Sequence, residues 1–173
     1  MWHAVDSESS TPDVTAARTW QRGRSFEDFA VGDVYRHHWG RTITEADAVA
    51  FATQTLQYNP IYLNAERARE LGHPGLVVSP YLVLALVVGL SVEDLSERSE
   101  AFLGLTDVEF GDPVYTADTI SSTSTVEAVR TSRSNPRNGI VTWRTEGQNQ
   151  HGRPVVTFQR SNLFQIGGSS AAD

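Results

Sequence analysis

The chain contains no cysteine among its 173 residues. This absence excludes disulfides, a thiolate nucleophile and sulfur ligands for a metal, and it suits a reducing compartment such as the cytoplasm. Basic residues are also few: 14 lysines and arginines stand against 21 acidic residues, for a formal net charge of −7. Proteins that bind nucleic acid need a basic face for the phosphates, so this charge argues against that class of function.

Long apolar runs are missing as well. The longest one, at 76–90, is interrupted by Ser79-Pro80 and falls short of the roughly 20 residues that a membrane span requires. The first two dozen residues lack the apolar core of a signal peptide. We therefore expect no membrane segment, a cytoplasmic location, and one domain at 25–166 between flexible tails at 1–24 and 167–173.

Helix signals fill the first half of the predicted domain. Thr44 precedes acidic and small apolar residues at helical spacing and is expected to cap a short helix. The stretch around Asn59-Pro60 breaks that spacing and predicts a looping excursion. Asn64 is expected to cap a second short helix, which Gly72 ends.

A third, central helix is expected at 81–90. Ser79 can accept from the first-turn amides, and Pro80 at the first helical position loses no needed donor. Because this helix is apolar on every side, other structure should wrap it. The strands expected after it are 107–110, 119–129, 139–148 and 154–164. Together these elements predict an α+β domain whose antiparallel sheet wraps one long buried helix, and whose free sheet edge favours self-association.

Two short stretches carry a family resemblance. Residues 57–62 are Gln57-Tyr58-Asn59-Pro60-Ile61-Tyr62, and the central helix begins at Ser79-Pro80. They resemble, in order, the Asp-x-Asn-Pro-x-His and His-Gly motifs of the MaoC-like hydratase and dehydratase family. Further similar segments are 26–33, 41–47, 108–114, 130–136 and 139–142, and the last two look most like mesaconyl-CoA hydratases. The resemblance, which extends to (R)-specific enoyl-CoA hydratases, implies a hot-dog fold.

The resemblance also implies where the chemistry would lie. In that family the Asp and His hold the water that adds to the β-carbon of an enoyl thioester, which assigns the catalytic positions to Gln57 and Tyr62. An amide has no usable acid or base form, and a tyrosine donates a proton but is a weak base. Pro80 removes the backbone N–H that the family offers to the thioester carbonyl, and the Tyr81 amide could replace it.

The other candidate residues would bind substrate. They are Asn59, Ser79, Tyr81, Val88, Gly89, Arg130 and Arg133. Val88 and Gly89 could line an acyl tunnel. The arginines, with Arg137, could meet the phosphates of coenzyme A or of a phosphopantetheine carrier, although hairpin arginines are often only solvated. No separate cofactor is expected, because either carrier would be part of the substrate.

Three histidines are candidates for a metal site or for a place in a pocket. His37 and His38 fall in a predicted strand, where neighbours point to opposite faces, so a shared metal is not expected. His73 could reach a pocket from the junction before the central helix, but a position in solvent is favoured. No metal site is predicted.

Three functions remain open from the sequence. The first is a lyase that adds or removes water at an α,β-unsaturated or 3-hydroxy acyl thioester. The second is a non-catalytic acyl-binding subunit, similar to the chain without the Asp and His in mycobacterial-type (3R)-hydroxyacyl-carrier-protein dehydratases. The third, a thioesterase, is disfavoured because the acids Glu93, Asp94 and Glu97 follow the central helix. The expected partners are an acyl thioester, an identical or different hot-dog chain in a dimer, and an acyl carrier protein.

Overall fold

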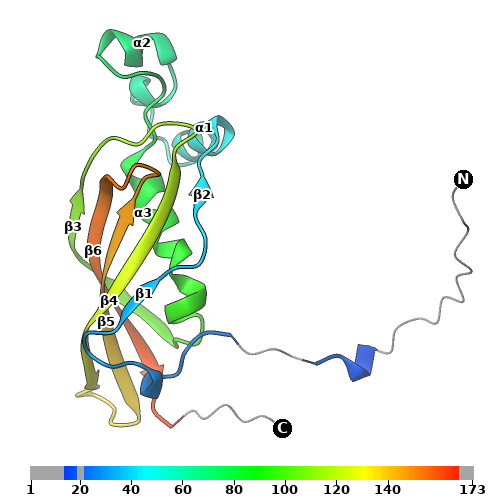
Figure 1. Ribbon diagram of the computed structural model, residues 1–173, viewed down its shortest axis with the longest axis vertical. Coiled ribbons are helices and arrows are strands. Elements are labelled where there is room, and N and C mark those ends of the chain that lie inside the picture. The colour runs from blue at the N-terminus through cyan, green and yellow to red at the C-terminus, as the bar shows by residue number, and fades with distance from the viewer. Residues whose placement is uncertain (1–13, 19–21, 168–173) are drawn as a thin grey trace, which may run out of the picture.

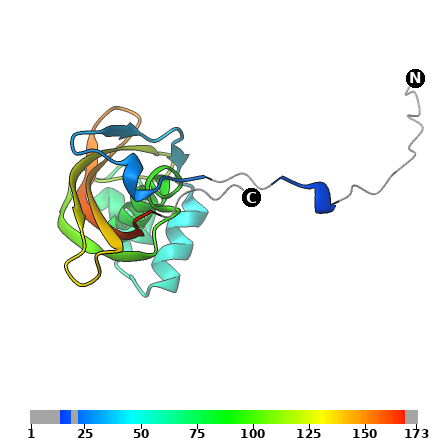
Figure 2. The ribbon, with the colours of Figure 1, turned by 90° about the horizontal axis from the view of Figure 1, so that it is seen from below.

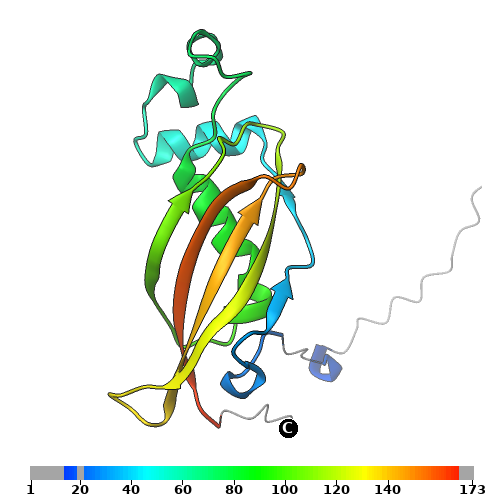
Figure 3. The same ribbon diagram turned by 60° about the vertical axis from the view of Figure 1, so that its left-hand side comes forward.

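The computed structural model of the chain describes residues 14–18 and 22–167. Its body is an antiparallel sheet of six strands that curls around the helix α3 (Figures 1 and 3). Seen along the long axis in Figure 2, the strands form a curved wall with α3 inside it. The predicted α+β architecture, a sheet around one central helix, is therefore present. Most of the tail residues expected at the two ends lie outside the described residues.

The elements follow one another in a simple order. The helices are η1 (Val14–Ala16), η2 (Phe26–Asp28), α1 (Glu45–Gln54), η3 (Pro60–Tyr62), α2 (Ala65–Glu70), α3 (Pro80–Leu90) and η4 (Val92–Ser96). The strands are β1 (Val34–Arg36), β2 (Arg41–Thr42), β3 (Ala101–Phe110), β4 (Thr119–Thr131), β5 (Asn138–Gln148) and β6 (Pro154–Gln165). In the sheet their order is β1-β4-β5-β6-β3, and β2 also pairs with β4.

The two short helices begin at the residues that the sequence predicts. Thr44 Oγ1 accepts a hydrogen bond from the Asp47 amide at 3.2 Å, and the Asp47 carboxylate accepts one from the Thr44 amide at 2.9 Å. Asn64 Oδ1 accepts from the Arg67 amide at 3.1 Å at the start of α2. These bonds satisfy amides that lack a partner within the helix.

The concave face of the sheet carries the core. Trp143 on β5 and Phe158 on β6 are fully buried. The Trp143 ring meets Phe29 and Phe164 edge to face, with ring centroids 5.3 and 5.9 Å away. Burying a large apolar side chain contributes on the order of 2–3 kcal/mol. These contacts therefore hold the segment after η2 and the end of β6 firmly together.

A polar layer interrupts this core. His37 Nδ1 lies 2.8 Å from the Asp94 carboxylate, and its Nε2 lies 2.9 Å from Ser124 Oγ, which is itself 2.8 Å from Thr145 Oγ1. Burial lowers the pKa of His37 below its usual value, and the hydrogen bond to Asp94 opposes that effect. The imidazole therefore resists protonation inside the folded chain.

A buried arginine lies on the same concave face. The Arg160 guanidinium stands over the Trp143 ring at 5.3 Å from its centroid. Burial lowers the pKa of Arg160 to about 10, which still leaves the group charged at neutral pH. Its charge also acts to lower the pKa of His37.

The sheet covers α3 on one side only. Val83, Val87 and Leu90 face the sheet and are buried, whereas Tyr81 is 60% exposed and Ala85 is exposed. The expectation that α3 is wrapped on every side therefore holds for its sheet-facing side alone. The reason is geometric, since one curved sheet encloses only part of a helix and the described residues supply no second layer over the rest.

Strand β3 forms one edge of the sheet. Within the described part of the chain it pairs with β6 alone. Its side chains Phe102, Leu103, Val108 and Phe110 are all exposed. Two register shifts interrupt its pairing with β6, between Phe102 and Gly104 and between Thr106 and Glu109.

The described residues contain neither a membrane-spanning helix nor a cluster of metal ligands. No helix in this part of the chain is long and apolar enough to cross a membrane. Nor do the described histidine, aspartate and glutamate side chains gather in a group of three or more that could hold a metal ion.

Candidate active site

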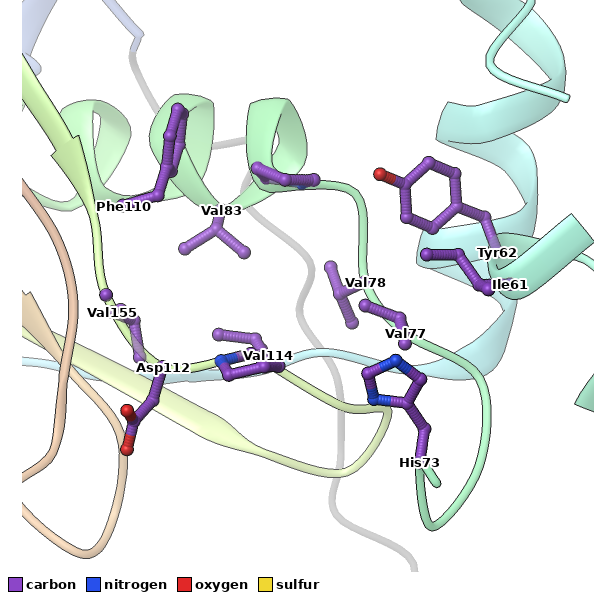
Figure 4. A pocket seen from close by; sticks show the side chains of 13 residues that line it. Ile61, Tyr62, His73, Val77, Val78, Val83, Phe110, Asp112, Val114 and Val155 are labelled. Carbon is purple, nitrogen blue, oxygen red and sulfur yellow. The ribbon is translucent and has the colours of Figure 1, made fainter. Parts of the chain in front are cut away.

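A cavity of about 270 Å³ opens at the N-terminal end of α3. Its walls come from η3, from the segment before α3, and from the end of β3 with the loop that follows it. Most of the lining is apolar, with Val77, Val78, Val83 and Val114 around it. Figure 4 shows Tyr62 and His73 on the same side of the cavity, with Val77 and Val78 between them. The site therefore combines an apolar chamber with a phenol and an imidazole.

Tyr62 is one of the two candidate catalytic residues, and its ring lies in the cavity wall. Asn59 begins η3: its Oδ1 accepts from the Ile61 amide at 3.3 Å, and its carbonyl accepts from the Tyr62 amide at 3.0 Å. Asn59 thus shapes the turn that carries Tyr62. Burial, and to a smaller extent Tyr81, raises the pKa of the Tyr62 phenol above its ordinary value. Tyr62 therefore remains protonated at neutral pH and acts as a hydrogen-bond or proton donor.

Gln57, the other candidate, has a different surrounding. Its Oε1 accepts a hydrogen bond from Ser79 Oγ at 2.6 Å, and the residues that line the cavity do not include it. The structure therefore does not bring Gln57 and Tyr62 together around the cavity. Gln57 instead ties the loop before η3 to the first turn of α3.

The predicted role of Ser79 as the side-chain cap of α3 is wrong. The sequence predicts that its hydroxyl caps α3, but it makes no capping hydrogen bond. The hydroxyl points to Gln57 and is the donor there. Pro80 still occupies the first turn of α3, as predicted, and its ring also lines the cavity. Tyr81 follows with its ring exposed, against Phe110 at a centroid distance of 6.4 Å.

For His73 the sequence favoured a position in solvent over one in a pocket, and that expectation is wrong. The structure places it in the cavity wall. Its Nδ1 lies 3.0 Å from the hydroxyl of Tyr115, and its second ring nitrogen lies on the side of the ring toward Val77 (Figure 4). The only available signal was its position between a helix-ending glycine and the central helix. The partner Tyr115 is 42 positions further along the chain, and sequence spacing does not reveal such a pair.

Known proteins agree with this architecture. The family model described as mesaconyl-CoA hydratase matches residues 3–173. The chain belongs to the mesaconyl-CoA hydratase family. It is 39% identical over 169 residues to a mesaconyl-CoA hydratase of Haloarcula hispanica, a match that covers 97% of this chain and 47% of that protein. A beta-methylmalyl-CoA dehydratase of Chloroflexus aurantiacus is 32% identical over 138 residues, or 80% of this chain and 39% of the relative.

Solved structures place this family member among MaoC-like hot-dog proteins. A MaoC domain protein dehydratase from Chloroflexus aurantiacus superposes with a TM-score of 0.81 at 29% identity, over 90% of this chain and 44% of the other. A monoamine oxidase regulatory protein from Archaeoglobus fulgius superposes with a TM-score of 0.73 at 28% identity, over 84% of this chain and 97% of the other. The predicted hot-dog fold is thus confirmed. The chain spans about half the length of the mesaconyl-CoA hydratases that it matches.

The remaining candidate residues of this family member lie away from the cavity. Val88 is half-buried and Gly89 exposed, near the C-terminal end of α3, and the cavity lining includes neither. Arg130 and Arg133 are exposed, at the end of β4 and in the β4–β5 connection. Figure 1 shows that connection at the opposite end of the sheet from α2. Within one chain, the arginines and the cavity are therefore separated by the length of the sheet.

Proposed function

We propose that this chain binds an α,β-unsaturated or 3-hydroxy acyl thioester in the cavity at the start of α3 and adds or removes water there. The observation that carries the proposal is the cavity itself, whose valine walls suit an acyl chain and whose Tyr62 and His73 can exchange protons. The named activities of the relatives, mesaconyl-CoA hydratase and beta-methylmalyl-CoA dehydratase, support the same substrate class.

The start of α3 supports a position for the thioester carbonyl. The first amides of a helix lack partners within the helix, and the positive end of its dipole favours developing negative charge. Because Pro80 has no N–H, the amide of Tyr81 is the first donor that α3 can offer. The loss of one such donor typically lowers the rate by about 100-fold or more. We therefore expect slow turnover unless the backbone amide of Tyr81 donates a hydrogen bond to the thioester carbonyl.

The test is an absorbance assay with the purified chain. Mesaconyl-CoA and crotonyl-CoA each lose enoyl absorbance when water adds to the double bond. Hydration of either substrate supports the proposal, and an increase for the double variant Gln57→Asp with Tyr62→His would return the chemistry to positions 57 and 62 in place of Tyr62 and His73. A chain that binds neither substrate and hydrates neither contradicts the proposal.

A second candidate function, a non-catalytic subunit, is favoured by the open faces of the molecule. Tyr81 on α3 and Phe102, Leu103 and Val108 on β3 are exposed apolar side chains that nothing in the described part of the chain covers. The chain also spans only 47% of its Haloarcula hispanica relative. We propose that a second hot-dog domain, identical or different, covers this surface. In the non-catalytic arrangement that partner supplies the acid and base.

Native mass measurement distinguishes these arrangements. The chain is expressed alone and together with a second hot-dog chain from the same cell, and each preparation is assayed with crotonyl-CoA. An active homodimer contradicts the non-catalytic function. A heteromer that is active while the isolated chain is inert supports it. Comparing crotonyl-CoA with a crotonyl group on an acyl carrier protein decides which carrier the complex accepts.

A further inference from the structure

We propose that His73 is the base of this cavity and that Tyr62 is the acid. His73 then takes the catalytic role that the sequence assigned to position 57, and Tyr62 keeps its own. This inference rests on the proposed function. It assigns proton transfer to a residue that lies outside both family motifs found in the sequence. Four features of the described residues support it: the orientation of His73, its partner, the segment that holds it, and the alternatives around the cavity.

The orientation of the ring suits a base. Nδ1 lies 3.0 Å from the Tyr115 hydroxyl, and the other nitrogen, Nε2, lies on the side of the ring toward Val77 and Tyr62, which also line the cavity (Figure 4). A phenol oxygen accepts a hydrogen bond as well as donating one. When Nδ1 donates to Tyr115, the lone pair of Nε2 is directed into the cavity. The same hydrogen bond remains after Nε2 takes a proton, because both nitrogens of an imidazolium are donors.

The segment around His73 is held by backbone contacts. The His73 amide donates to the Ala68 carbonyl at 3.0 Å, at the end of α2. Gly72, just before it, has φ of 88°, a left-handed conformation that favours glycine and lets the chain turn sharply. Tyr115 is fixed in turn, since its amide donates to the Asp118 carboxylate at 2.8 Å and it bridges to Val77. The imidazole is therefore presented by two restrained segments.

Other titratable or polar groups near the cavity fit the role less well. The Asp112 carboxylate points away from the chamber in Figure 4 and lies 3.5 Å from Arg153 Nη1. Gln57 is an amide engaged with Ser79. The phenol of Tyr62 is held protonated by burial, which raises its pKa. Among the described residues that line the cavity, His73 is the one with a ring nitrogen that can accept a proton and is not the nitrogen beside Tyr115.

The proposed steps balance. In hydration, Nε2 of His73 takes a proton from water while the water oxygen bonds to the β-carbon. The electron pair of the double bond moves toward the thioester as an enolate, and the α-carbon then takes the proton of the Tyr62 hydroxyl. The proton on the imidazolium returns through solvent to the phenolate. The sum is one water added across the double bond, with both side chains restored.

Kinetics of matched variants test the assignment in the 173-residue chain. His73→Gln is expected to lower kcat by about 100-fold or more, since general base catalysis contributes at least that much, with a smaller change in KM. The control is His38→Gln, an exposed histidine, which should retain wild-type kcat and KM. A His73→Gln variant within twofold of wild type would overturn the assignment.

A binding measurement keeps the inference testable if His73→Gln folds poorly. Ring resonances of wild-type protein are followed by nitrogen–proton NMR during titration with the unreactive butyryl-CoA. The His73 signal, identified by its change in the Tyr115→Phe variant, which removes the hydroxyl beside Nδ1, should shift as the thioester saturates the protein. Saturation without any His73 shift overturns the inference while leaving the proposed function standing. Wild-type protein that neither binds butyryl-CoA nor hydrates crotonyl-CoA overturns both.

Discussion

The hydroxyl of Ser79 donates a hydrogen bond to Oε1 of Gln57 across 2.6 Å, although 22 positions separate the two residues in the chain. Ser79 is 1% exposed, so the bond forms in a place where an unpaired polar group would be costly. It joins the loop that carries Tyr62 to the start of α3. The geometry of the cavity mouth therefore depends on a pair of polar residues that do not themselves line it.

Removing this bond should destabilise the fold. We expect Ser79→Ala to lower the free energy of unfolding by about 1 kcal/mol, because Gln57 then loses its donor. Urea unfolding followed by circular dichroism measures the change. The matched control is Ser121→Ala, at a half-exposed position of β4, where a loss under about 0.5 kcal/mol is expected. Equal losses in both variants would show that the Ser79 bond contributes nothing specific.

Stability should depend on pH through His37. Burial lowers the pKa of His37 in the folded chain below its usual 6.5, so below pH 6.5 the unfolded chain binds a proton that the folded chain refuses. The free energy of unfolding should therefore fall as the pH drops below about 6.5, by at most about 1.4 kcal/mol per pH unit.

Denaturant unfolding between pH 8 and pH 5 measures that slope. His37→Gln should be less stable at pH 8 but show a flatter dependence on pH, because it removes the titrating group. His38→Gln, at an exposed position, should keep the wild-type slope. If His37→Gln and wild type decline in parallel, another group is responsible.

Tyr115 should act as a positioning residue for His73. Tyr115→Phe removes the hydroxyl that lies 3.0 Å from Nδ1 but keeps the ring. We expect about a 10-fold lower kcat, the equivalent of one ordinary hydrogen bond, with KM little changed. Steady-state kinetics with crotonyl-CoA checks the split. A rise in KM alone would mean that Tyr115 contributes to binding instead.

A charge on the exposed edge strand should prevent association. Phe102 on β3 is 56% exposed, and Phe102→Asp places a carboxylate where the proposed second hot-dog domain would pack. Light scattering should then show a smaller assembly with unchanged circular dichroism. Val31→Asp, at a residue 64% exposed elsewhere, is the control and should leave the assembly intact. An unaltered mass for Phe102→Asp would place the interface on another face.

Local signals in the sequence were sufficient for much of the fold. The caps at Thr44 and Asn64, and the proline at the start of α3, predict helix starts because each acts on amides within a few residues. Alternation predicted β4, β5 and β6 and the end of β3, but β3 begins at Ala101 instead of 107, and the short strands β1 and β2 were not predicted with them. The free side of α3 could not be foreseen, since an apolar helix has the same sequence whether its cover comes from its own chain or from a partner.

The candidate site was only partly accessible to the same approach. The motif position of Tyr62 led to a residue of the cavity wall, because Asn59 and Pro60 shape the turn locally. His73 required knowledge of a contact with Tyr115 across the chain. Val88 lies near the C-terminal end of α3, and Arg130 lies at the end of β4. Because both elements are long, these residues lie far from the cavity at the start of α3.

The two breaks in the pairing of β3 restrict what can be added to that edge. Gly104 and Asp107, at φ of 149° and 50°, interrupt the regular row of amides and carbonyls that an incoming strand would need. Irregular edges of this kind hinder the endless stacking of sheet upon sheet that leads to fibrils. The apolar edge of the sheet can therefore stay exposed for one complementary partner domain while its irregular backbone protects the chain against aggregation.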